Sequence, residues 1–454
     1  MVTAEEPRGK RQMSMALQIS ADGRRIERAD GADWFWLGDT AWDLFVRLTR
    51  EETELYFAKR QEQGFTAIQA VALMGYHLAW NAPNAYDHRP CVAGDPTRPD
   101  TNGRENYWTH VDQVIDAAAR HGLHIALLPV WGTFLDGQNG AEVPFDEENA
   151  VVYARWIAER YQDRPNIVWV NGGDIRGDSR PVIEDLIGEA IKEVCPHQLM
   201  TYHPRGESDS GMWFHNREWL DFNMFQSGHG RLGNRTDAFV DRGWRRQPAK
   251  PVLDGEPCYE KHPVNWKPDT GTFDDQDVRQ AAYWSLFAGA CGHTYGHVNV
   301  WCFNAPHEMP PQTMTVAMDH GLHWRNELDS AGAHQMTHVR NLMGSRPQAG
   351  RAPAQDLLVG EGSGEGRLRA TQGNGYAFAY ASLGGLIGVD LDRLPWSEHT
   401  CWWYNPRTGK ATRADQVSNT FTPPGVPERG NDWVLVVDDR SKHYPPPGQL
   451  PETL

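Results

Sequence analysis

The chain alternates short apolar runs with stretches of helical periodicity over most of its length, and this alternation constrains the fold more than any other feature. Eight apolar runs have the length of a strand, and most are followed by a segment whose apolar residues recur at helical spacing. Strands that alternate with helices form parallel sheets, and eight such units predict an α/β fold, a closed (β/α)8 TIM barrel. The predicted strands are 34–37, 65–73, 124–130, 167–170, 199–202, 222–225, 251–253 and 294–301.

The helical segments carry start and stop signals. Thr49-Arg50-Glu51-Glu52 is a capping-box sequence that opens a helix, and Gly64 ends it. No glycine-rich nucleotide-binding motif follows any of the runs, which disfavours an open, doubly wound sheet. Further helices are predicted at 107–120, 147–161 and 181–194, and a last helical stretch at 312–343 would complete the barrel.

The pattern changes after Gly344 to short runs separated by Gly, Pro and Asn. Turn signals at this spacing predict a small C-terminal antiparallel β-sandwich domain. We therefore divide the 454 residues into a mobile N-terminus (1–15), a barrel domain (16–344), a sandwich domain (345–441) and a Pro-rich tail (442–454).

The composition restricts the partners. A formal net charge of −16 and a pI near 5.6 disfavour binding to nucleic acid or to an anionic membrane, because the average surface would repel both. The 19 tryptophans and 19 histidines suit a carbohydrate partner, because the C–H faces of sugars stack on aromatic rings and histidines offer polar donors. The alternative is that the tryptophans fill a large core. Nothing in the sequence selects an oligomeric state.

The six cysteines are scattered without a repeated spacing, which predicts mostly free thiols. The first 20 residues lack the apolar core of a signal peptide, and no run of ~18 apolar residues occurs. We expect a cytoplasmic protein as written, or a secreted or periplasmic one if a leader was removed.

Two carboxylates follow buried strands directly. The strand 251–253 leads through Asp254 and Gly255 to Glu256, where Gly and Pro residues break the strand and turn the side chain outward. The strand 167–170 likewise ends in Asn171, two glycines and Asp174. Either acid alone could equally be a helix cap or a solvated loop residue. Together, at the carboxyl ends of barrel strands, they form the pair that a glycosidase needs.

Other polar and aromatic residues at the predicted strand ends are candidates for substrate binding. Period-two alternation over 293–301 places His, Tyr, His, Asn and Trp on one face, which we expect to point into the barrel. The long loop 74–105 is expected to cover the mouth with His77, Trp80 or Tyr86, unless these rings only pack the loop against the barrel. The substrate-binding candidates are Asp39, Trp42, His77, Trp131, Asn171, His203, Gln226, His229, His297 and Trp301.

A metal site is a weaker interpretation. Cys291, His293, His297 and Cys302 lie close in sequence, but residues 293 and 297 would be ~13 Å apart on one strand, too far to bind one ion. We therefore expect no metal and no cofactor. A metal-dependent hydrolase that uses the histidines, and a non-catalytic carbohydrate-binding protein on the same scaffold, remain the two alternatives to a glycosidase.

Several motifs together resemble the apiosidase-like family of glycoside hydrolases, over roughly residues 16–440. The resemblance is carried by WFWLGDTAWDLFVRLTREE, GFTAIQAVAL, WVNGGD, VLDGEPCYE, WWYNPRTGK and DWVLVVDD. It implies a retaining (β/α)8 glycosidase acting on a plant-type or similar glycan, with a pentofuranose such as apiose as one candidate. It also implies an acid/base on the N-G-G-D motif, at Asp174, and a nucleophile on the D-G-E-P motif, at Glu256.

Two further points follow from the resemblance. Retaining barrel glycosidases of the wider clan carry Asn-Glu in direct succession at the acid/base position, whereas two glycines separate Asn171 from Asp174 here. The C-terminal module of the family is called a "putative collagen-binding domain". We expect it to brace the barrel, because a domain's label does not establish its function.

Overall fold

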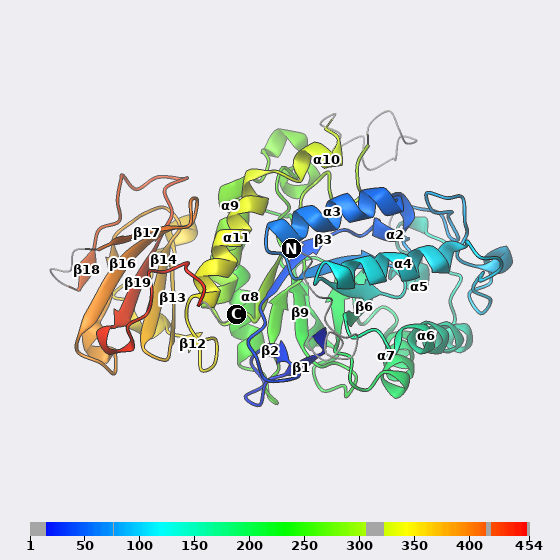
Figure 1. The fold of residues 1–454 in the computed structure, drawn as a ribbon, viewed down its shortest axis with the longest axis horizontal. Coiled ribbons are helices and arrows are strands. Elements are labelled where there is room, and N and C mark those ends of the chain that lie inside the picture. Colours follow the sequence, from blue (N-terminus) through cyan, green and yellow to red (C-terminus); the bar gives the residue numbers. More distant parts are fainter. Residues whose placement is uncertain (1–14, 76, 306–321, 415–418, 452–454) are drawn as a thin grey trace, which may run out of the picture.

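The computed structural model describes residues 15–75, 77–305, 322–414 and 419–451. Within these residues a parallel barrel of eight strands is joined to a separate antiparallel sheet, as predicted (Figure 1). A short strand, β8 (Ser208–Asp209), adds to the barrel sheet antiparallel to β9. The barrel strands are β3 (Trp36–Thr40), β4 (Ala67–Val71), β5 (His124–Leu128), β6 (Ile167–Ile175), β7 (Met200–Pro204), β9 (Asn223–Gln226), β10 (Val252–Asp254) and β11 (Gly292–Tyr295).

The ring closes between β7 and β9 through single hydrogen bonds. The backbone N–H of Asp221 donates to the Met200 carbonyl at 2.8 Å. The Thr201 hydroxyl donates to the Phe222 carbonyl at 2.6 Å. The two ends of the sheet are therefore adjacent, and the carboxyl ends of the eight described strands meet at one mouth.

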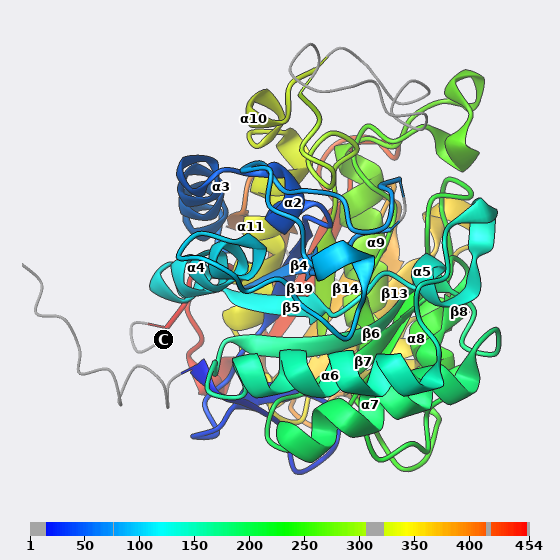
Figure 2. The same ribbon diagram turned by 90° about the vertical axis from the view of Figure 1, so that its right-hand side faces the viewer.

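Helices surround the barrel, and α6 and α7 run side by side along one flank (Figure 2). The capping box at the start of α3 is confirmed: the Thr49 side chain accepts the Glu52 N–H, and the Glu52 side chain accepts the Thr49 N–H. The helices are α2 (Leu44–Arg47), α3 (Arg50–Glu62), α4 (Tyr107–Arg120), α5 (Thr133–Asp136), α6 (Glu147–Tyr161), α7 (Pro181–Val194), α8 (Thr236–Trp244), α9 (Asp275–Phe287), α10 (Trp324–Glu327) and α11 (Ala331–Gly344).

A short N-terminal hairpin, β1 (Leu17–Ile19) with β2 (Ile26–Arg28), precedes the barrel. The predicted mobile N-terminus lies outside the described residues apart from Met15, whose carbonyl is hydrogen-bonded to the buried His124 ring at 2.7 Å. The predicted helical stretch 312–343 lies partly outside them as well, and its described part forms α10 and α11.

The prediction for the eighth strand is wrong in the length of the strand and in which of its side chains point into the barrel. β11 ends at Tyr295, and the N–H groups of Val300 and Trp301 both bond to the His297 carbonyl, so the chain turns there instead of continuing in the sheet. Thr294 faces the barrel interior, where its hydroxyl accepts the Trp36 indole N–H at 3.2 Å. Tyr295 points outward and donates to Glu260 at 2.6 Å.

The sandwich domain begins after α11 and carries a six-stranded sheet in the order β12-β13-β14-β19-β16-β17. Alternate residues of its strands belong to two different cores. Phe378 and Tyr380 pack with the barrel helices, whereas Ala377 and Ala379 pack on the other side of the sheet. The strands are β12 (Ala352–Pro353), β13 (Leu368–Gly373), β14 (Tyr376–Ala381), β16 (His399–Asn405), β17 (Lys410–Arg413) and β19 (Trp433–Asp439), with a separate pair, β15 (Ile387–Gly388) and β18 (Thr420–Phe421).

Buried ion pairs join the two domains. Arg279 on α9 donates to both carboxylate oxygens of Asp432, each at 3.0 Å. Arg346, just after α11, forms the same two-pronged pair with Asp438 at 2.8 and 2.7 Å. The Tyr283 ring of α9 stacks on Tyr380 with 4.7 Å between centroids. The sheet and the barrel helices therefore share one continuous core.

All six cysteines are buried free thiols, as predicted. None of the described helices is long and apolar enough to cross a membrane.

Candidate active site

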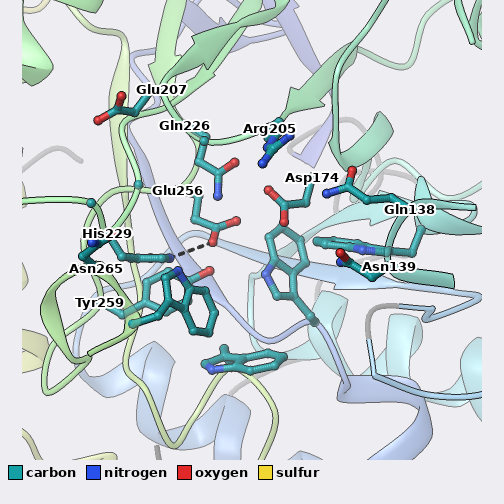
Figure 3. A pocket seen from close by; sticks show the side chains of 17 residues that line it. Gln138, Asn139, Asp174, Arg205, Glu207, Gln226, His229, Glu256, Tyr259 and Asn265 are labelled. Carbon is teal, nitrogen blue, oxygen red and sulfur yellow. Dashed lines mark hydrogen bonds and ion pairs between the residues drawn. The ribbon is translucent and has the colours of Figure 1, made fainter. Parts of the chain in front are cut away.

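A cavity of about 380 Å³ opens at the mouth of the barrel (Figure 3). Its size lies within the range of small-ligand sites. Seven of the residues that the sequence suggested line it, namely Trp42, Trp131, Asp174, Gln226, His229, Glu256 and Trp301. An eighth, His203, lies directly behind them, with its ring 5.1 Å from the Trp42 ring.

Glu256 stands where β10 gives way to a loop. A side chain at the preceding Gly255 would meet the Met224 sulfur at 2.4 Å, so glycine lets the two segments pack closely without displacing Met224. The Glu256 side chain is almost fully buried and lies between two imidazoles. His203 Nε2 lies 2.9 Å from Oε2, and His229 Nε2 is hydrogen-bonded to Oε1 at 3.0 Å.

The two histidines keep Glu256 ionised. Burial raises the pKa of the Glu256 carboxyl, but the contacts with His203 and His229 outweigh it and hold that pKa well below its usual range. The Asp174 backbone nitrogen lies 3.4 Å from His203 Nδ1, so the His203 ring contacts both acids.

Asp174 is aimed into the cavity by a turn that the two glycines make possible. Gly172, Gly173 and Asp174 have positive φ angles of 84°, 113° and 59°, and the pairing of β6 with β7 shifts register across them. A side chain at Gly173 would lie 2.9 Å from both the Gly132 nitrogen and the Trp131 ring. A left-handed non-glycine residue costs about 1–3 kcal/mol, and such strain concentrates at functional sites.

The environment of Asp174 favours its protonated form. Burial, and then the negative charge of Glu256, raise the pKa of the Asp174 carboxyl from 3.8 to about 7. The positive environment of His203 and Arg205 and a hydrogen bond with Gln226 offset part of this rise. Figure 3 shows the two carboxyl groups facing one another across the cavity. The surroundings thus raise the pKa of one acid and lower the pKa of the other at the same cavity, as in sites that pair an acid with a nucleophile.

Besides His203, four of the suggested substrate-binding residues do not line the cavity. The Asp39 carboxylate accepts the Arg60 Nε–H at 2.6 Å, beneath α3. The Asn171 amide donates to the Glu184 carbonyl of α7 at 2.8 Å. His297 Nε2 lies 3.0 Å from Glu327. These groups point into the layer between strands and helices, where polar side chains stabilise the barrel wall.

The fourth is His77, whose Nε2 lies 2.8 Å from Asp43 and whose ring meets the Trp301 ring edge-on at 5.4 Å. His77 thus packs against Trp301, which lines the cavity. The other rings expected from the loop 74–105 also pack against the barrel: Trp80 meets the Phe134 ring edge-on at 5.1 Å, and the Tyr86 hydroxyl accepts the Arg50 N–H at 2.8 Å. The alternative, that these rings only pack the loop against the barrel, describes the three side chains.

Further lining residues were not suggested by the sequence. Arg205 directly follows β7, and Tyr259 belongs to the same D-G-E-P-C-Y run as Glu256, so both carried a usable signal. The other additional lining residues lie on irregular loops, where no strand or helix periodicity predicts which way a side chain points. The additional polar and aromatic lining residues are Gln138, Asn139, Arg205, Glu207, Tyr259, Asn265 and Trp266.

A metal centre is not supported by the described side chains. In that part of the chain, no three His, Cys, Asp or Glu residues are grouped as a ligand set would require. His293 lies fully buried, and burial lowers the pKa of its imidazole to about 3.

Comparison with known proteins agrees with the geometry. Residues 20–349 match the family described as "Apiosidase-like, catalytic domain". The chain belongs to the apiosidase-like family. Residues 352–438 match a second family, described as "Putative collagen-binding domain of a collagenase". No curated protein is similar enough in sequence to count as a match.

Two solved structures resemble this chain over 96% of its length, including the C-terminal domain. A glycoside hydrolase family 5 protein from Bacteroides vulgatus ATCC 8482 is 34% identical over 96% of both chains, with a TM-score of 0.89. A second structure, described as a glycoside hydrolase, is 34% identical over 96% of this chain and 99% of its own, with a TM-score of 0.88. A third, from the same Bacteroides strain, shares the fold at 15% identity, with a TM-score of 0.67. This apiosidase-like protein is thus a glycoside hydrolase with a TIM barrel.

Proposed function

We propose that the enzyme hydrolyses its glycosidic bond with retention of configuration, using Glu256 as the nucleophile and Asp174 as the acid and base. The observation that carries the proposal is that two carboxyl groups line one cavity in surroundings that shift their pKa values in opposite directions. The pKa of Glu256 is lowered by its contacts with two histidines, whereas the pKa of Asp174 is raised to about 7 by burial and by the charge of Glu256.

The chemistry follows in two steps. In the first, a Glu256 carboxylate oxygen forms a bond to the anomeric carbon while Asp174 gives its proton to the departing oxygen. A glycosyl ester and a free alcohol result. In the second, the Asp174 carboxylate removes a proton from water, the water oxygen attacks the anomeric carbon, and the Glu256 carboxylate leaves. Asp174 is reprotonated at the end of the cycle.

The substrate is a glycan, and a pentofuranose such as apiose is the first candidate for the sugar that is released. Membership of the apiosidase-like family supports this choice. Aromatic rings at Trp42, Trp131 and Trp301 offer surfaces for the C–H faces of a sugar, and the 380 Å³ volume suits a ligand of small size.

A screen against aryl glycosides and pectic oligosaccharides tests the activity, with products separated by chromatography and the first-formed anomer read by NMR. We expect a product that retains the substrate's configuration and a complete loss of turnover in Glu256→Gln. An inverted product would contradict the mechanism. Carbohydrate binding without any product would favour the non-catalytic alternative, and loss of activity in EDTA would favour the metal-dependent one.

The roles of the two acids separate on mutation. Glu256→Ala should abolish turnover on every substrate. Asp174→Ala should retain more activity on aryl glycosides with good leaving groups, which need little protonation, and azide should rescue it by attacking the glycosyl ester. Equal losses on good and poor leaving groups, with no rescue by azide, would assign the acid/base role to another residue.

A further inference from the structure

An exposed indole lies at the rim of the cavity. Trp266, on the loop that follows Glu256, is 40% exposed and contributes to the lining. Among the large apolar side chains that are exposed in the described residues, Trp266 is the one aromatic; the others are aliphatic or Met. Because this exposed ring also lines the cavity, its face is available to stack on a ligand there.

The backbone beneath this indole is strained and firmly anchored. Asn265 and Trp266 both have positive φ angles, 53° and 60°, and a left-handed conformation is uncommon for a residue as bulky as Trp. The Asn265 N–H donates to the His229 carbonyl at 2.7 Å, and the Trp266 N–H donates to the Pro263 carbonyl at 3.1 Å. Strain of this kind is retained at ligand clamps because surrounding contacts impose it.

The rings of His262 and His229 lie between the Trp266 indole and Glu256. The Trp266 ring meets His262 edge-on, with 4.4 Å between centroids and 89° between planes. His262 is fully buried and stacks on His229 at 4.4 Å, and His229 is hydrogen-bonded to Glu256. The indole is thus braced on its protein side. Little conformational entropy remains to be lost when a ligand covers its exposed surface.

We propose that Trp266 is the stacking platform of a second sugar subsite, next to the one at Glu256, and that the natural substrate is an oligosaccharide long enough to reach it. The inference rests on the proposed glycosidase function and extends it to substrate length. Sugar C–H faces stack on indole, and the Asn265 side chain, which also lines the cavity, can hydrogen-bond the hydroxyl groups of the same ring.

Substrate length provides the test. Trp266→Ala is compared with the wild type on an aryl glycoside of the released sugar and on an oligosaccharide that carries the same bond and is longer by at least one ring. We expect kcat/KM on the oligosaccharide to fall about tenfold or more, and kcat/KM on the aryl glycoside to change less than about twofold, as expected for a residue remote from the reacting bond. Trp266→Phe should recover part of the loss. Leu232→Ala, which removes an equally exposed side chain on a neighbouring loop, should leave both values unchanged.

Two outcomes overturn the inference: an equal loss on both substrates, or no loss on either. Thermal unfolding of each variant separates a folding defect from a lost contact. Calorimetric titration of the oligosaccharide into Glu256→Gln, with and without Trp266→Ala, gives a second readout that needs no turnover, and equal affinities would also refute the platform. A wild-type enzyme inactive on the whole glycoside panel would instead reject the proposed function.

Discussion

The Asp432 carboxylate joins the sandwich to the barrel, and its removal should destabilise both domains. Asp432 is fully buried and accepts two hydrogen bonds from Arg279, each at 3.0 Å, and a third from the Tyr380 hydroxyl at 3.1 Å. Arg279 is equally buried, on the helix that follows the loop carrying Glu256 and Trp266. Asp432→Ala would leave Arg279 with Asp275 as its remaining carboxylate partner.

The expected magnitude follows from the burial. Removing one partner of a buried ion pair costs about 3–5 kcal/mol when the other charge is left unpaired, and the remaining contact of Arg279 with Asp275 favours the lower end of this range. Each kcal/mol lowers the Tm of a domain of 150–250 residues by ~2–4 °C, so Asp432→Ala should unfold roughly 6–20 °C below the wild type. The barrel domain has more than 250 residues, and larger domains show smaller Tm shifts per kcal/mol, so we expect a shift in the lower part of the ~6–20 °C interval.

Differential scanning calorimetry at a fixed scan rate measures the effect. The double variant Arg279→Met/Asp432→Leu is the matched control, because removing both charges and filling the space should restore most of the lost stability. Arg407→Ala removes a more exposed cation 3.6 Å from the same carboxylate and should cost about 1 kcal/mol or less. A Tm within 2 °C of the wild type for Asp432→Ala, or a double variant no more stable than the single one, would refute the reasoning.

Three further predictions concern the site and its surroundings. Gly173→Ala should lower kcat/KM about tenfold or more and should also lower Tm, because the residue has a φ of 113° and the added methyl group would displace Trp131 and the turn that aims Asp174; unchanged kinetics would contradict this. Since Asp174 must be protonated to act and its pKa is raised to about 7, kcat/KM on substrates with poor leaving groups should fall above about pH 7, and a profile flat to pH 9 would exclude Asp174 as the acid. Burial raises the pKa of Glu184 from 4.5 to about 8, so the folded state binds more protons than the unfolded state between these values. The free energy of unfolding should therefore fall as the pH rises from about 4.5 to 8. In Glu184→Gln, the free energy of unfolding measured by urea titration at each pH should fall less steeply over this range.

The barrel could be predicted from the sequence because its determinants are local. The spacing of apolar residues in 107–120 or 181–194 defines a helix without reference to the rest of the chain, and the capping box at Thr49 marks a helix start by itself. Asp174 and Glu256 could be proposed as the catalytic pair for the same reason: each stands a few residues after an apolar run, and the carboxyl ends of parallel strands meet at one mouth.

Which side of a strand a residue occupies was decided by the tertiary structure. Asn171 and Asp39 stand near strand ends, as the sequence indicated, yet their side chains bond to α7 and α3 in the barrel wall. A shift of one residue in strand register exchanges the inner and outer faces, and the apolar pattern of a strand buried on both sides does not distinguish them. The eighth strand was predicted on the wrong face for this reason, with Thr294 and not Tyr295 turned inward.

The chemical state of the two acids also depends on contacts between distant segments. Glu256 is held ionised by histidines from the loop after β9 and from β7, whereas the pKa of Asp174 is raised by burial and by the charge of Glu256. The sequence alone determined that two carboxyl groups follow two strands. Only the folded barrel decided which of them keeps its proton, because a pKa is set by the charges and hydrogen-bond donors that surround a group in space.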